Sequence, residues 1–278
     1  MKFIDNIKLY YMGFRDDFSK AQCYETGLHV NKNIVRAFKL YQQAMQQGDA
    51  RAYFRMAQWH QENGRLNQAL EAYCGGAIRN HVPSRRALEK FAADKNVEAI
   101  YLMGKVFIKD LNWERAIGCY KTAVTMKHPD AMYELGNIYR EERGDVDGRI
   151  KIKKNIVEVL GCYRRAATEG SKYALNELVE MSSSNGLAAF HLAEMYRQGE
   201  GGLCSNSLRT FFYYAIAARQ NHPDAQRYLE QQVKSGDADA QYTWGYYYYL
   251  EKGAISEGIH WCVKAEMQGH QQALTYLE

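Results

Sequence analysis

The sequence predicts an all-α fold, a right-handed α-solenoid of about six helix hairpins with three extra single helices. Three observations support this prediction. A pattern of small and aromatic residues recurs at helical spacing, which is typical of repeat architectures. Only three prolines occur in 278 residues, so long uninterrupted helices are favoured. The longest unbroken apolar run, residues 211–218, falls far short of the roughly 20 residues that a membrane-spanning helix needs.

The clearest copies of the pattern mark the second helix of each hairpin. Each copy opens on a small or β-branched residue: Ala37, Ala69, Ala116, Val159, Thr210 and Gly258. Four residues later stands a tyrosine, or a cysteine in the last copy: Tyr41, Tyr73, Tyr120, Tyr163, Tyr214 and Cys262. Seven residues later stands a small residue: Ala44, Gly76, Ala123, Ala166, Ala217 and Ala265. These positions share one helix face, so each segment predicts an amphipathic helix.

A partner helix precedes each of these segments. The predicted starts of these first helices are Asp16, Ala52, Ala99, Ala131, Ala188 and Ala240. A large and a small residue follow four and five positions later, as in Leu135 and Gly136, and an aromatic residue stands at position eight. These positions fall within an arc of about 140° on a helix. Small residues at such positions let two helix backbones approach closely.

The remaining segments complete the solenoid. Three amphipathic stretches, roughly 84–95, 174–185 and 225–236, predict single helices between hairpins. Pro83, Pro129 and Pro223 each fall in the turn after a second helix, where an interruption is harmless. Residues 1–15 predict an N-terminal capping helix, and residues 16–278 predict a single solenoid that ends in an incomplete hairpin at 273–278. Terminal units of a solenoid are expected to be atypical.

One copy carries the pattern without gaps, at Tyr24, Gly27, Val30, Asn33, Arg36, Ala37, Tyr41, Ala44 and Gly48. On these residues, and on the turn 196–202, the chain resembles the Sel-one-like repeat family, a branch of the tetratricopeptide-like (TPR-like) helical repeats. The likeness covers roughly residues 16–273. The second and third hairpins have shorter turns, closer to the tetratricopeptide kind, and the fourth hairpin carries a long insertion.

The resemblance implies a concave surface lined by the first helix of each hairpin, at helix positions 2, 6 and 9. The residues expected to bind a partner there are Phe54, Tyr101, Lys105, Tyr133, Asn137, Arg140, Phe190, Glu194, Arg197, Tyr242, Tyr246 and Tyr249. Aromatic residues and arginine are the residues that most often anchor interfaces. The alternative is that the aromatic residues at position 2 pack between adjacent hairpins. The four tyrosines of 246–249 cannot all face one core, so we expect at least one to be exposed.

Eight histidines invite a catalytic or metal-binding interpretation. Four of them, however, occupy one repeat position, and equivalent positions in successive units of a solenoid do not converge: His81, His128, His222 and His270. We therefore expect no metal and no cofactor. The chain contains no H-E-x-x-H, G-x-S-x-G or Walker-type motif, so we expect no enzyme, with an unrecognised enzyme as the less favoured alternative.

The charge balance is 36 basic against 32 acidic residues, which is too mild to indicate nucleic acid or an anionic membrane as partner. The insertion 141–155 gathers Arg149, Lys151, Lys153 and Lys154. These residues form either a contact loop for an acidic partner or a solvated loop before a helix, which is the favoured interpretation.

The sequence thus predicts a non-enzymatic protein–protein interaction module that binds a partner protein or an extended peptide. The resemblance implies an adaptor, a scaffold or a regulator of the partner, and bacterial members of the family include effectors and toxin regulators. An RNA-binding helical repeat is the alternative. Six scattered cysteines and the lack of a signal peptide predict a cytoplasmic protein, or one delivered to another cell's cytosol without a cleavable signal.

Overall fold

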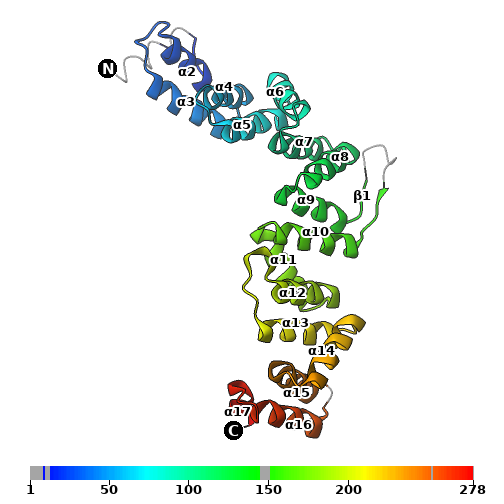
Figure 1. Ribbon diagram of the computed structural model, residues 1–278. Helices are drawn as coiled ribbons and strands as arrows, with labels where there is room; N and C mark the ends of the chain where they lie inside the picture. Colours follow the sequence, from blue (N-terminus) through cyan, green and yellow to red (C-terminus); the bar gives the residue numbers. More distant parts are fainter. Residues whose placement is uncertain (1–8, 10–12, 145–150, 252, 278) are drawn as a thin grey trace. The chain divides into compact units, whose positions relative to one another are not determined.

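The computed structural model describes residues 9, 13–144, 151–251 and 253–277 (Figure 1). The chain divides into two compact units. Unit 1 comprises residues 1–126 and 144–150, and unit 2 comprises residues 127–143 and 151–278. The helices of unit 1 are α2 (Asp17–Thr26), α3 (Ile34–Gln46), α4 (Ala50–Glu62), α5 (Leu66–Ile78), α6 (Val82–Ala93), α7 (Val97–Lys109) and α8 (Trp113–Thr125).

Unit 2 continues the same succession of short helices. Its helices are α9 (Pro129–Arg140), α10 (Ile156–Thr168), α11 (Lys172–Ser182), α12 (Gly186–Gln198), the 3₁₀ turn η1 (Glu200–Gly202), α13 (Ser207–Arg219), α14 (Pro223–Ser235), α15 (Ala238–Glu251), α16 (Ile255–Glu266) and α17 (Gln271–Leu277).

The described residues form six antiparallel hairpins, as the sequence predicts. The paired helices are α2 with α3, α4 with α5, α7 with α8, α9 with α10, α12 with α13, and α15 with α16. The three extra helices are α6, α11 and α14. The predicted all-α solenoid fold of six hairpins and three single helices is therefore confirmed. Most of the predicted N-terminal capping helix lies outside the described residues, although Leu9 is helical and packs in the first hairpin's core.

The insertion between α9 and α10 contains the described strands, β1 (Arg143–Gly144) and β2 (Lys151–Ile152), which pair with each other. Lys153 and Lys154 follow as exposed residues. Arg149 lies outside the described residues, as does the side chain of Lys151. The described part of the insertion is thus a short two-stranded ladder followed by exposed residues that lead into α10.

Helix boundaries differ from the predicted ones in a regular way. Every second helix begins three residues before its predicted start, and five of the six first helices begin two residues before theirs. Side-chain caps explain the difference. Asn33, Asn112, Asn155 and Asn206 accept a backbone N–H of the first turn and so start four second helices. The predicted starts were the first buried small residues, whereas the preceding half-turn faces solvent and falls outside the apolar pattern.

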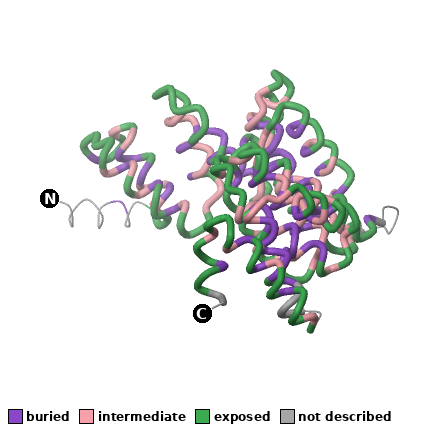
Figure 2. Tube along the Cα trace, turned by 60° about the horizontal axis from the view of Figure 1, so that its bottom comes forward, coloured by how far each residue is buried: buried purple, intermediate pink, exposed green. Residues whose placement is uncertain are grey.

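The core lies between the two helices of each hairpin, where buried residues follow one side of each helix (Figure 2). The tyrosine at position four of the second helix is fully buried in three hairpins: Tyr120, Tyr163 and Tyr214. A small residue opposite makes room for the ring. A Cβ placed on Gly136 would lie 2.7 Å from the ring of Tyr163. This distance confirms that small residues in the pattern permit close helix contact.

The extra helices share one register and are integral to the core. Each begins two residues before its predicted range, and each carries a leucine with no exposed surface: Leu88, Leu178 and Leu229. Pro83, Pro129 and Pro223 lie in the first turns of α6, α9 and α14, where a missing N–H breaks no helix bond. Each single helix is therefore packed into the core beside the neighbouring hairpins through its buried leucine.

Candidate partner-binding surface

The predicted partner-binding residues are divided between the two units. Phe54 of α4 and Tyr101 and Lys105 of α7 lie in unit 1. Unit 2 holds the other nine on its first helices: Tyr133, Asn137 and Arg140 on α9, Phe190, Glu194 and Arg197 on α12, and Tyr242, Tyr246 and Tyr249 on α15. Tyr249 belongs to α15, but its side chain lies outside the described residues.

The aromatic residues at position 2 pack against the second helix of their own hairpin. The ring of Phe54 lies 5.8 Å from that of Tyr73, Tyr133 lies 5.4 Å from Tyr163, and Phe190 lies 6.0 Å from Tyr214. Tyr101 is buried, and Phe54, Tyr133, Phe190 and Tyr242 are half-buried. These rings are therefore partly or fully covered by the protein itself.

The polar residues of the surface are anchored from beneath by buried tyrosines. The hydroxyl of Tyr163 donates a 2.6 Å hydrogen bond to Asn137, and that of Tyr214 donates to Glu194. Burial raises the pKa of Tyr163 to about 12, so this hydroxyl keeps its proton. The positions of Asn137 and Glu194 are consequently set by the hairpin core and not by solvent.

Two exposed arginines complete the arrangement in unit 2. The side chains of Arg140 and Arg197 are 44% and 42% exposed. Arg140 pairs with Glu177 of α11 at 3.2 Å, and the hydroxyl of Tyr133 lies 3.5 Å from the same carboxylate. Arg197 pairs with Glu194 at 2.7 Å. Each guanidinium is thus held by a carboxylate that also accepts from a tyrosine, an arrangement we call the arginine–carboxylate–tyrosine triad.

Electrostatics favour the ionised state of Glu194. Burial by itself would raise the pKa of Glu194, but hydrogen bonds from Arg197 and Tyr214 outweigh burial, so the pKa lies below its ordinary value. A third triad occurs in unit 1, where Tyr41 donates to Glu25 at 2.6 Å and Arg55 donates to the same carboxylate at 2.8 Å. Burial would likewise raise the pKa of Glu25, but hydrogen bonds from Arg55 and Tyr41 hold it below its ordinary value, so Glu25 and Glu194 are both charged near neutral pH.

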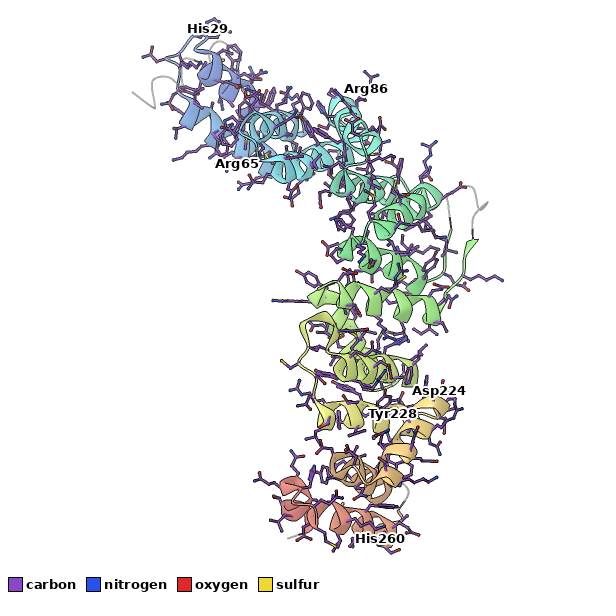
Figure 3. All side chains as sticks on the ribbon, viewed as in Figure 1. His29, Arg65, Arg86, Asp224, Tyr228 and His260 are labelled. Carbon is purple, nitrogen blue, oxygen red and sulfur yellow. The ribbon has the colours of Figure 1, made fainter. Side chains whose placement is uncertain are left out.

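Sequence reasoning missed the contributions of the extra helices. Tyr173 and Glu177 of α11 lie beside Tyr133. The ring centroid of Tyr228 of α14 lies 4.5 Å from that of Tyr214. Figure 3 labels Tyr228 on its helix. Glu177 and Tyr228 each precede the buried leucine of their helix, so the shared register of α11 and α14 was the available signal.

The tyrosine run of α15 divides between core and surface. Tyr246 is exposed and Tyr247 is buried, in agreement with the expectation that consecutive tyrosines cannot share one core. Tyr242 stacks on His270 with ring centroids 4.6 Å apart. The side chain of Tyr248, like that of Tyr249, lies outside the described residues. Tyr246 is therefore an exposed tyrosine among the described members of this run.

The four histidines at one repeat position are helix N-caps, a role that the sequence analysis did not assign. The Nδ1 atoms of His81, His128, His222 and His270 accept the backbone N–H three residues later in α6, α9, α14 and α17. The described residues contain no group of three or more His, Cys, Asp or Glu side chains that could hold a metal ion. Capping explains the repeat of these histidines in structural terms.

These caps predict a pH dependence of stability. Burial lowers the pKa of His81 and His222 below the ordinary value of 6.5, although Asp49 and Asp224 partly oppose the shift. These two imidazoles then bind protons more readily in the unfolded chain than in the folded protein. Their contribution to stability is therefore fully present above pH 6.5, and it is lost as the pH falls towards their pKa values in the folded protein. The double variant His81→Asn/His222→Asn keeps a capping oxygen at both positions, and this oxygen does not titrate. We expect its urea denaturation midpoint to fall less than that of wild type when the pH is lowered from 7 to 5.

The matched control for this prediction is His260→Asn, because His260 is an exposed residue of α16 that caps no helix (Figure 3). It should leave the pH profile unchanged. If the urea midpoint of the double variant declines as steeply as that of wild type, protonation of the two capping histidines is not a cause of the pH dependence. A cap contributes on the order of 1 kcal/mol, which is well within the resolution of urea denaturation.

Other titratable groups serve packing. Burial lowers the pKa of His191 to about 4, and Arg164 adds to the shift, so this imidazole is neutral at physiological pH. Burial raises the pKa of Cys74 and of Cys162 to about 11, which keeps both thiols protonated and unreactive. The described helices include none with the length and apolar character needed to cross a membrane.

Two solved structures are similar: a protective antigen of uropathogenic Escherichia coli with an SLR fold (17% identity, TM-score 0.29, 92% of this chain and 69% of that chain) and a Sel1 repeat protein from Oxalobacter formigenes (18% identity, TM-score 0.26, 94% and 95%). Chitin synthase regulatory factor 2 of Schizosaccharomyces pombe is 25% identical over 229 residues, which cover 80% of this chain. The match spans 40% of that relative's length.

The family model for the Sel1 repeat matches residues 9–49, 129–171, 186–222 and 238–270, together more than half of the chain. These ranges correspond to the hairpins α2/α3, α9/α10, α12/α13 and α15/α16. They omit α4/α5 and α7/α8. Four matched repeats, in register with the repeated tyrosine and small-residue positions, show that this chain belongs to the Sel1 repeat family.

Proposed function

We propose that the chain is a non-enzymatic interaction module whose unit 2 binds a partner protein or an extended peptide through the exposed residues of α9, α12 and α15. Arg140, Arg197 and Tyr246 make the direct contacts in this proposal. Tyr133, Asn137, Phe190, Glu194 and Tyr242 support them from beneath. In unit 1, Lys105 is the exposed member of the predicted set, and its Nζ lies 5.3 Å from the ring centroid of Tyr101.

The observation that carries the proposal is the pair of triads in unit 2. An exposed arginine normally loses side-chain freedom on binding, which opposes association. Arg140 and Arg197 are already held by Glu177 and Glu194, so less freedom remains to be lost. Arginine is also enriched among the residues that dominate binding energy. Sel1 repeats are typically protein-interaction modules, which supports the same proposal.

The triads favour protein over RNA as the partner. Each guanidinium lies beside a carboxylate, so the surface around Arg140 and Arg197 carries little net positive charge. Binding to RNA depends on uncompensated cations that neutralise phosphates. The regulatory function named for the fission-yeast relative supports a module that regulates the partner it binds, as one form of the adaptor or scaffold role.

The test is affinity capture from nuclease-treated lysate of the native source with wild type and with Arg140→Ala/Arg197→Ala. We expect the main captured protein to be recovered at least tenfold less by the variant, and its measured Kd to rise by the same factor. The fold should survive, because Glu194 keeps its bonds from Tyr214 and from Gln198, the latter at 2.9 Å.

The matched control is Arg165→Ala/Arg227→Ala, which removes two exposed arginines of unit 2 from outside the predicted set. Arg227 pairs with Asp224 three residues away, as Arg197 pairs with Glu194. Equal loss of the partner in both double variants, or capture that succeeds only when the nuclease is omitted, would contradict the proposal.

A further inference from the structure

A cavity of about 280 Å³ lies in unit 2 between α13 and α15, beside the end of α11. Its lining is mostly apolar and consists of Ser183, Phe212, Ala215, Ile216, Arg219, Thr243, Tyr246 and Tyr247. Phe212 and Tyr246 are 49% and 40% exposed, so two aromatic rings line the cavity while remaining accessible to solvent. Gln220 donates hydrogen bonds to the carbonyls of Ser182 and Ser183, which fixes the α11 end of the cavity.

The cavity arises from two small residues that face each other. At the three places where an extra helix follows a hairpin, the second helix of that hairpin also packs on the first helix of the next one: α5 on α7, α10 on α12, and α13 on α15. At α5/α7 the facing pair is Cys74 and Leu102, with the Cys74 Sγ 3.7 Å from the Leu102 carbonyl. By register, the pair at α13/α15 is Ala215 and Thr243.

The middle junction shows the same positions filled by large polar groups. There the facing residues are Arg164 and His191, and the charge of Arg164 lowers the pKa of His191 in addition to the effect of burial. Ala215 and Thr243 have the smallest combined volume of the three pairs. The space left by the smaller side chains at the α13/α15 junction is open to solvent, and it is lined by accessible aromatic rings.

The chemistry of the lining selects an occupant. A cavity of roughly 150 Å³ lined by apolar side chains can hold benzene, so this one has room for a bulky apolar side chain and part of its backbone. Arg219 is the charged residue of the lining, and α13, with sequence SLRTFFYYAIAAR, carries no acidic residue. Charge complementarity therefore favours an acidic neighbour beside the apolar group.

We infer that this cavity is an anchor pocket that takes one bulky apolar side chain from an acidic segment of a partner protein, with Arg219 facing the acidic residue. The inference rests on the proposed function and specifies the chemistry of the partner at one point of unit 2. Desolvated pockets that receive a single large side chain are typical of the positions that dominate interface energy.

The test uses the full chain and a phage-displayed library of random dodecapeptides, followed by fluorescence anisotropy with the enriched peptides under reducing conditions. We expect the enriched peptides to share a bulky apolar residue with Asp or Glu close by. Ala215→Cys/Thr243→Leu, which introduces the pair found at α5/α7, narrows the cavity and should raise Kd at least tenfold. Arg219→Glu should raise Kd by a similar factor, and Arg227→Glu, the charge-matched control, should not.

Several results would overturn the inference. These are enrichment of no peptide, enriched peptides without acidic residues, or unchanged Kd in both the narrowed and the Arg219→Glu variants. Binding of indole that is lost in the narrowed variant, with no peptide bound, would assign the cavity to a small molecule. Self-association of wild type in sedimentation velocity that the narrowed variant lacks would assign it to a second copy.

The Arg219→Glu variant leaves the core unchanged, so the test stands even if the narrowed variant folds poorly. The outcome is also separable from that of the proposed function. If the narrowed variant still captures the lysate partner that Arg140→Ala/Arg197→Ala loses, the anchor pocket fails and the proposed function stands. If the reverse holds, the arginine contacts fail and the pocket stands.

Discussion

Replacing Leu229 by alanine is expected to lower the free energy of unfolding by about 2–5 kcal/mol, the usual range for a leucine that is removed from a packed core. Leu229 has no exposed surface and lies in a cluster with Tyr214, Ala225, Val233 and Trp244. The cluster joins α14 to α13 and α15, so the lost contacts affect three helices at once. Urea denaturation followed by circular dichroism measures the effect.

Leu274→Ala is the matched control, because it removes the same atoms from a side chain of α17 that is 45% exposed. It should change the free energy of unfolding by no more than about 0.5 kcal/mol, as surface substitutions usually do. Equal effects of the two substitutions would show that α14 is not docked in the core of unit 2.

Gly201→Ala is expected to destabilise unit 2 by about 2–5 kcal/mol, through two additive effects. Gly201 lies in η1 with φ of 66°, a left-handed conformation that costs a residue with a Cβ about 1–2 kcal/mol. A Cβ there would also lie 2.5 Å from the carbonyl oxygen of Ala167 in α10. Because the obstacle is helix backbone, it cannot move aside, and overpacking of this kind costs about 1–3 kcal/mol.

The neighbouring glycine separates the two effects. Gly202 has φ of 74°, and a Cβ on it would have no atom within 4 Å. Gly202→Ala should therefore show the conformational cost alone, and the difference between the two variants in urea denaturation should be about 1–3 kcal/mol. Identical destabilisation by both substitutions would mean that η1 does not approach α10 closely in solution.

The helices and their pairing could be predicted because the signal for them is local and periodic. A buried stripe at helical spacing determines which face of a helix is covered. Within one hairpin, the ring of Tyr163 fits against Gly136 on the partner helix. All but one of the helix starts were wrong by two or three residues, since caps such as Asn33 and His222 precede the buried stripe.

The surface was less predictable than the core for a physical reason. The carboxylates of the triads come from different repeat positions: Glu25 at position 9, Glu194 at position 6, and Glu177 on an extra helix. Periodicity therefore cannot show that each meets an arginine and a tyrosine. The twelve predicted contact residues stay a prediction, with the exposed ones carrying the proposed binding.

The amino-acid sequence by itself determined the six hairpins, the three extra helices and the membership in a repeat family, because each depends on side-chain spacing along a single helix or on one helix pair. The tertiary structure decided what occurs between hairpins. The triads and the cavity at Ala215 and Thr243 depend on which side chains from separate helices come within contact distance. Such contacts depend on the packing of helices distant in sequence, which no periodic pattern within a single helix encodes.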